Sequence, residues 1–151
     1  FLSYVLSFVF LGIYWNNHHH MLQAVRQVNG QILWGNLYLL FWLSLVPFVT
    51  GWMGKNHFAT WPVALYGVVL LMAAIAYYIL SRALIRHHGH DSALAKAVGN
   101  DFKGKISIVF YVTAISLAFW NRWAALGIYV LVAVMWLIPD RRIEQTLSES
   151  R

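Results

Sequence analysis

Cysteine is absent from this 151-residue chain, so no disulfide can cross-link the fold and no thiolate can bind a metal. Charge is also scarce: Asp, Glu, Lys and Arg make up 11% of the residues, whereas apolar residues make up 60%. Typical soluble domains contain about 25% charged residues. A soluble domain of this size could not cover its surface with so few polar groups. The composition therefore indicates a protein whose outer surface lies largely in lipid.

Acidic residues are rarer than basic ones, and none of the five lies within an apolar segment. They are Asp91, Asp101, Asp140, Glu144 and Glu149. Proton-coupled carriers and many cation transporters use buried carboxylates near the middle of the membrane. The lack of such groups argues against a proton pump, a carboxylate-lined carrier and an intramembrane enzyme. It permits a passive pore, whose wall can consist of apolar side chains, hydroxyls and carbonyls.

Five apolar segments predict an all-α fold, a polytopic membrane helix bundle that forms a single transmembrane domain over residues 1–151. We expect its helices at about 1–19, 31–53, 61–84, 105–121 and 123–139, with a loop over 85–104 and a tail over 140–151. About 20 helical residues cross the hydrocarbon core, a length that the second and third segments reach outright. The segments do not alternate polar and apolar residues as membrane strands do.

Basic residues divide unequally between the two ends of these helices. One side holds Lys55 and Arg122, and the other holds nine: Arg26, Arg82, Arg86, Lys96, Lys103, Lys105, Arg141, Arg142 and Arg151. The positive-inside rule places the nine, and with them the C-terminus, in the cytosol. Five helices then leave the N-terminus outside, so we expect one more membrane helix before Phe1. Because the basic residues occupy short loops rather than one soluble face, we expect no binding to nucleic acid.

Polar side chains on the first two helices are candidates for function. Ser3, Ser7, Tyr14 and His18 recur at helical spacing and share one stripe. Such a stripe either packs closely against another helix or faces a water path, and the sequence leaves both open. Trp15 and His19 are one turn apart and should stack. Asn36, within the second helix, should face other helices rather than lipid.

Two histidine clusters raise the question of a metal. His18, His19 and His20 end the first expected helix, and His87, His88 and His90 lie in the expected loop 85–104. Neutral imidazoles bind zinc or copper, and Asp91 could add an oxygen ligand. However, adjacent helical residues point about 100° apart, so three in a row cannot share one ion. We expect no metal and no cofactor, while a histidine-rich metal-ion transporter remains the alternative, with a non-conducting assembly subunit as a third reading.

The first half of the chain resembles a known family. The shared pieces are Ser7-Phe8, Tyr14-Trp15, His18-His19, Asn36, Leu45-Val46-Pro47-Phe48 with Thr50, and Ala64-Leu65-Tyr66. In order and spacing they are similar to the prokaryotic and endolysosomal potassium-channel family whose repeat has six helices. The five segments would then be the second to sixth helices of the repeat. The first helix of the repeat, which carries the pore-lining residues, has no counterpart here and is expected upstream of Phe1.

The resemblance implies a function as well as a fold. It implies a subunit of a potassium-permeable channel, with proton permeability left open, in a prokaryotic plasma membrane. It also implies a homo-oligomer, a tetramer in prokaryotic members, and no enzymatic activity. Trp15, His18 and His19 would form a network that supports the pore helix, whereas His20 has no counterpart and is expected to be solvated.

Overall fold

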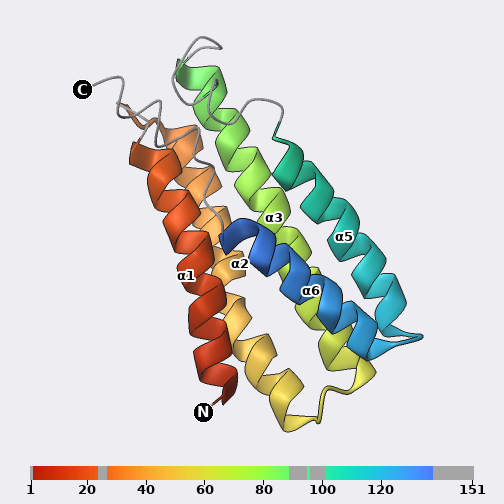
Figure 1. Ribbon diagram of the computed structural model, residues 1–151. Coiled ribbons are helices and arrows are strands. Elements are labelled where there is room, and N and C mark those ends of the chain that lie inside the picture. The colour runs from red at the N-terminus through yellow and green to blue at the C-terminus, as the bar shows by residue number, and fades with distance from the viewer. Residues whose placement is uncertain (1, 24–26, 89–94, 96–100, 138–151) are drawn as a thin grey trace.

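The computed structural model describes residues 2–23, 27–88, 95 and 101–137. These residues form five long helices: α1 (Leu2–Gln23), α2 (Gly30–Lys55), α3 (Thr60–His88), α5 (Phe102–Ala118) and α6 (Arg122–Leu137). Consecutive helices run antiparallel, and none of the described residues lies in a strand (Figure 1). The predicted all-α, five-helix fold is confirmed. Gln23, Gly30, His88 and Phe102 lie at one end of the bundle, which we call the basic end because it carries Arg82, Arg86, Lys103 and Lys105.

Short polar residues start three of the helices by hydrogen bonding to otherwise unpaired amide groups. The Asn29 side chain accepts from the Ile32 amide at 3.0 Å, and the Asp101 carboxylate accepts from the Gly104 amide at 3.1 Å. Asn121 accepts from the amides of Trp123 and Ala124. A side-chain oxygen at this position stabilises a helix start by about 1 kcal/mol. These caps place the turns between helices and make α5 and α6 a tight hairpin.

Two predicted boundaries at the basic end are wrong, and burial explains both. The first helix does not end at the histidines but continues to Gln23, because Met21 is fully buried among residues of α2 and α3. The third helix continues past residue 84 to His88, because Leu84 and Ile85 are also buried. His87 therefore lies in a helical turn rather than in a loop. Most of the expected loop 85–104, and the tail 140–151, lie outside the described residues.

Helix α3 is the centre of the bundle and contacts α2, α5 and α6. Small buried side chains line these contacts: Ala73, Ala74 and Ala76 on α3, and Ala114 and Ala118 on α5. Lipid tails are as apolar as leucine, so membrane helices gain little from burying large apolar groups and instead pack through small residues that let backbones approach. The alanine content of α3 therefore accounts for its central position.

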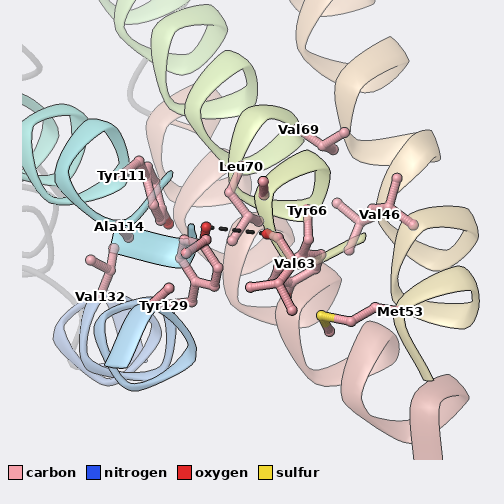
Figure 2. Close-up of a cluster of buried hydrophobic side chains, with 14 of the residues drawn as sticks. Val46, Met53, Val63, Tyr66, Val69, Leu70, Tyr111, Ala114, Tyr129 and Val132 are labelled. Carbon is pink, nitrogen blue, oxygen red and sulfur yellow. Dashed lines mark hydrogen bonds between the residues drawn. The ribbon is translucent and has the colours of Figure 1, made fainter. Parts of the chain in front are cut away.

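Three tyrosines fill the core between α3, α5 and α6 (Figure 2). Tyr66, Tyr111 and Tyr129 are almost fully buried, and the rings of Tyr66 and Tyr129 meet edge to face at 5.5 Å. The Tyr129 hydroxyl donates a hydrogen bond to the Val63 carbonyl at 3.2 Å. Gly67, one turn along α3, leaves room for this hydroxyl, since a Cβ added there would lie 2.0 Å from it. The hydroxyl thus joins α6 to the backbone of α3.

The outer surface of the bundle is strongly apolar, as the composition predicts. Two helices, α2 and α3, are long and apolar enough to cross a membrane, and α6 is a shorter apolar helix. Large exposed side chains cover the outward faces, with Phe8, Phe41, Phe48, Leu37 and Val130 among them. Trp61, Trp120 and Trp123 ring the end opposite the basic end, where tryptophan is typical of a membrane–water interface.

Candidate functional site

His18 and Asn36 join α1 to α2 near the basic end. The His18 Nε2 and Asn36 Oδ1 atoms are 2.6 Å apart, and both side chains are half-buried. Because a carbonyl oxygen only accepts, the imidazole donates through Nε2, which leaves Nδ1 as an acceptor in the neutral ring and a donor in the charged ring. The prediction that Asn36 faces another helix is confirmed. Sequence spacing did not pair it with His18.

Trp15 and His19 lie on a different face of α1. Their rings stack at 5.0 Å between centroids and 12° between planes, as their spacing predicts. This stack faces outward, since Trp15 is 62% exposed and His19 is also exposed. His20 was expected to be solvated but is half-buried, because α1 continues beyond it. The histidine run therefore divides: His18 bonds within the bundle, and His19 lies on its surface.

The predicted polar stripe on α1 faces into the bundle where the structure describes it. Ser7 is buried, and the Tyr14 hydroxyl interacts with the hydroxyl of Tyr111 on α5. These two positions favour the packing interpretation over a water path. The side chain of Ser3 lies outside the described residues. Any role of the stripe in conduction stays a prediction.

A cross-bundle polar layer, made of Asn17, His18, Asn36, Tyr77, Ser107 and Trp136, was missed by sequence reasoning. The Asn17 side chain donates to the Trp136 carbonyl at 3.1 Å, and the Trp136 indole donates to the Ser107 hydroxyl at 2.9 Å. The Tyr77 hydroxyl lies 3.5 Å from the Asn17 carbonyl. Together with the His18–Asn36 bond, these contacts link α1 to α2, α3 and α6, and α6 to α5.

The signals for this layer were weak but present in the sequence. Asn17 directly precedes His18, and an amide within a membrane helix needs a partner. The Trp136 indole likewise needs an acceptor when it is removed from water. The partners lie far away in sequence, however, since Asn17 and Trp136 are 119 positions apart. Sequence could therefore indicate that these side chains have hydrogen-bond partners, but it could not identify the partners.

A small cavity adjoins the polar layer. It has a volume of about 20 Å³ and lies among Tyr14, Asn17, Tyr77, Tyr111 and Trp136, with apolar side chains completing its wall. A cavity needs about 10–15 Å³ and several polar partners to hold a water molecule. The cavity meets both conditions for roughly one water.

The described residues contain no cluster of three or more histidine or acidic side chains that could hold a metal. At the basic end, His87 Nδ1 lies 3.2 Å from the side-chain nitrogen Nδ2 of Asn29. His87 therefore lies beside the start of α2. The side chain of His88 and both His90 and Asp91 lie outside the described residues. The expectation of no metal therefore stays a prediction.

Comparison with known proteins agrees with the resemblance stated above. A family model described as endosomal/lysosomal potassium channel TMEM175 matches residues 1–47. A potassium channel of Chryseobacterium sp. (strain P1-3) is 55% identical over 150 residues, which cover 99% of this chain and 78% of that protein. The chain belongs to the TMEM175 potassium-channel family. A potassium channel of Streptomyces collinus (strain DSM 40733 / Tue 365) is 28% identical over 145 residues, covering 87% and 68% of the two chains. No solved structure matches the chain.

The segment matched by the TMEM175 model contains α1 and most of α2. It therefore includes the His18–Asn36 bond and the Trp15–His19 stack. Asn17 also lies in this segment, whereas its partner Trp136 lies at the far end of the chain. The identity to the Chryseobacterium channel, in contrast, extends over nearly the whole chain and therefore includes all five described helices.

Proposed function

We propose that this TMEM175-family chain is a subunit of an oligomeric, potassium-permeable membrane channel, and that ions pass between subunits rather than through one bundle. The observation that carries the proposal is the near full-length similarity to a bacterial potassium channel. Passive conduction also agrees with the lack of acidic residues in the five described helices, since a pump or proton-coupled carrier would need them. We further propose that the assembly is a homotetramer in the plasma membrane of a prokaryote.

Packing supports a path between subunits. The described helices enclose a core of fully buried side chains, among them Tyr66, Leu70, Tyr111 and Tyr129. Interiors packed in this way leave few voids larger than a water molecule, and the cavity beside the polar layer has only about 20 Å³. A potassium ion could not cross such a bundle without displacing its core. Several copies arranged around an axis would instead form a path on their shared surfaces.

The outward face of α1 is the surface we assign to the neighbouring pore helix. It carries a line of exposed aromatic side chains, Tyr4, Phe8 and Trp15, followed by exposed His19. Aromatic residues are enriched at protein interfaces, where they bury large areas at low entropic cost. We propose that Trp15 and His19 contact the pore helix directly. His18, on another face of α1, would hold this helix against α2 through its hydrogen bond to Asn36.

Potassium flux into liposomes tests this function. The complete natural protein, purified and reconstituted, is expected to carry potassium at a rate proportional to protein content, with valinomycin defining full equilibration. Vesicles without protein provide the background. A flux equal to this background, from protein that is folded and inserted, would contradict the proposal and favour a non-conducting assembly subunit.

The two neighbouring histidines make a matched pair of variants. We propose that His19 donates a hydrogen bond to a charged group on the pore helix, and such a bond contributes roughly 1.5–3 kcal/mol. We therefore expect His19→Ala to lower potassium flux by about tenfold. We expect His20→Ala to change flux little, although it removes a half-buried ring and so costs more in subunit stability. Flux and thermal stability measured on the same preparations should therefore rank the variants in opposite orders. Identical flux for both variants and wild type would rule out the role given to His19.

Membrane orientation can be tested with single cysteines, since this sequence contains none. Gln27 at the basic end and Asn56 at the opposite end are both exposed. From the nine-to-two distribution of basic residues, we propose that the basic end lies in the cytosol. In intact cells, an impermeant maleimide is expected to label Asn56→Cys at once and Gln27→Cys only after permeabilisation. The reverse pattern would overturn the orientation.

A further inference from the structure

A second site is present at the basic end, away from the polar layer. A cleft of about 750 Å³ opens between the start of α2 and the last turns of α3. Its polar lining comes from Asn29, Gln31, Tyr78, Arg82, Arg86 and His87, and Ile79 is among its apolar residues. The proposed channel function uses none of these side chains.

The cleft carries positive charge that no described carboxylate neutralises. Arg82 and Arg86 are one helical turn apart on α3 and both line the cleft. In the part of the chain that the structure describes, the only acidic residue is Asp101, and it caps α5. Guanidinium groups bind phosphate through two parallel hydrogen bonds. The charge of the cleft therefore suits a phosphate group.

The walls of the cleft are held in place by local contacts. The Arg82 guanidinium lies over the Tyr78 ring at 5.1 Å from its centroid, and Arg82 is only half-buried. Asn29 Nδ2 and His87 Nδ1 are 3.2 Å apart and link the start of α2 to the end of α3 across the cleft. The same Asn29 caps α2. The two basic side chains are thus presented by rigid helix ends rather than by a loop.

Exposed apolar side chains lie at the same end of α2 and α3 as the basic side chains. Ile79, one turn from Arg82 toward the middle of the bundle, lines the cleft and is 47% exposed. On α2, Leu33 and Leu37 are exposed, and Trp34 is 75% exposed near the same end. A free phosphate ion gains nothing from contact with apolar side chains. A phospholipid, in contrast, places its phosphate against the basic groups and its acyl chains along the apolar side chains.

We propose that this cleft binds the phosphate of an anionic phospholipid at the membrane surface, with Arg82 and Arg86 as the main ligands and Tyr78, Asn29 and His87 as polar neighbours. Such a lipid would join α2 to α3 at the basic end. The hydrogen bond between His18 of α1 and Asn36 of α2 lies near the same end. The site requires only that the protein lies in a membrane. It does not require that the protein conducts potassium, so the two proposals can fail separately.

The test compares lipid retention in wild type, Arg82→Gln/Arg86→Gln and Lys105→Gln. Each protein is equilibrated in equal amounts of phosphatidylglycerol and phosphatidylcholine, and bound lipid is counted by native mass spectrometry. Wild type is expected to retain about tenfold more phosphatidylglycerol than phosphatidylcholine. This ratio corresponds to one charge-assisted hydrogen bond that only the anionic lipid makes. The double variant should lose this preference. Lys105→Gln, an exposed cation at the same end but outside the cleft, should keep it.

Three results would overturn the proposal. Equal retention of both lipids by wild type would show that the cleft has no headgroup preference, as it would if another subunit covered it. An unchanged preference in the double variant would place the lipid elsewhere. Displacement of phosphatidylglycerol by millimolar inorganic phosphate would make the ligand a soluble phosphate. If the double variant does not fold, the single variant Arg86→Gln replaces it, because Arg86 is exposed and its substitution should not disturb packing. We expect this variant to lower the preference for phosphatidylglycerol by about threefold.

Discussion

Gly67→Ala is expected to destabilise the bundle by about 1–3 kcal/mol, the cost of inserting a methyl group into a packed core. The added Cβ would lie 2.0 Å from the Tyr129 hydroxyl and 2.8 Å from Ile115 Cγ1, so α3 could no longer approach α6 and α5 as closely. The hydrogen bond from Tyr129 to the Val63 carbonyl would lengthen or break. The measurement is thermal unfolding in detergent, followed by helical circular dichroism.

Matched glycines provide the control for this variant. At Gly127 on α6 and Gly51 on α2, an added Cβ would have no atom within 4 Å apart from its chain neighbours and the backbone of its own helix, so alanine there should be neutral or slightly stabilising. Tyr129→Phe removes the hydroxyl that Gly67 accommodates and should recover part of the stability lost in Gly67→Ala. An effect of Gly67→Ala no larger than that of Gly127→Ala would mean that the three helices are farther apart than described.

His18→Ala is expected to cost about 1–3 kcal/mol of stability, because it leaves the half-buried Asn36 amide without its partner across the α1–α2 contact. Asn36→Leu removes the other half of the pair. In the double variant the losses should not add, and the coupling energy should be about 0.5–2 kcal/mol, the range found for hydrogen bonds between membrane helices. Unfolding of all four proteins under one condition gives this cycle.

Thr113→Ala is a suitable control for the His18 cycle, since Thr113 is exposed and its hydroxyl bonds to the Val109 carbonyl on its own helix. It should change stability little. Strict additivity of His18→Ala and Asn36→Leu would show that the bond has no net value in the membrane. Potassium flux should fall with His18→Ala as well, because α1 would lose part of the contact that fixes its outward face.

The positions of the helices could be predicted from sequence because apolar runs and capping residues mark them locally. Asn29, Pro62 and Asn121 lie where helices begin, and their effect depends on residues within one turn. The ends at the basic side could not be predicted this way. Met21 and Leu84 extend α1 and α3 by packing against other helices. The histidines near them in sequence interrupt the apolar pattern, so the burial of Met21 and Leu84 could not be predicted.

The site shows the same limit. The i,i+4 stack of Trp15 on His19 follows from helix geometry and could be predicted from spacing alone. The bond between His18 and Asn36, and the contact of Asn17 with Trp136, depend on how helices are arranged around one another. The resemblance to the channel family implied that His19 rather than His20 belongs to a functional pair, which stays a prediction. Sequence could not show that His19 faces outward, because that depends on which face of α1 the other helices cover.

Flux measured on size-separated preparations tests the central claim most directly, namely that potassium passes between subunits of an oligomer. The complete protein would be separated into oligomeric and monomeric fractions, identified by mass, and reconstituted in liposomes at equal mass and high dilution. We expect potassium flux from the oligomeric fraction and background flux from the monomeric one. Equal flux per chain from both fractions would contradict the account, because it would place the ion path inside a single bundle.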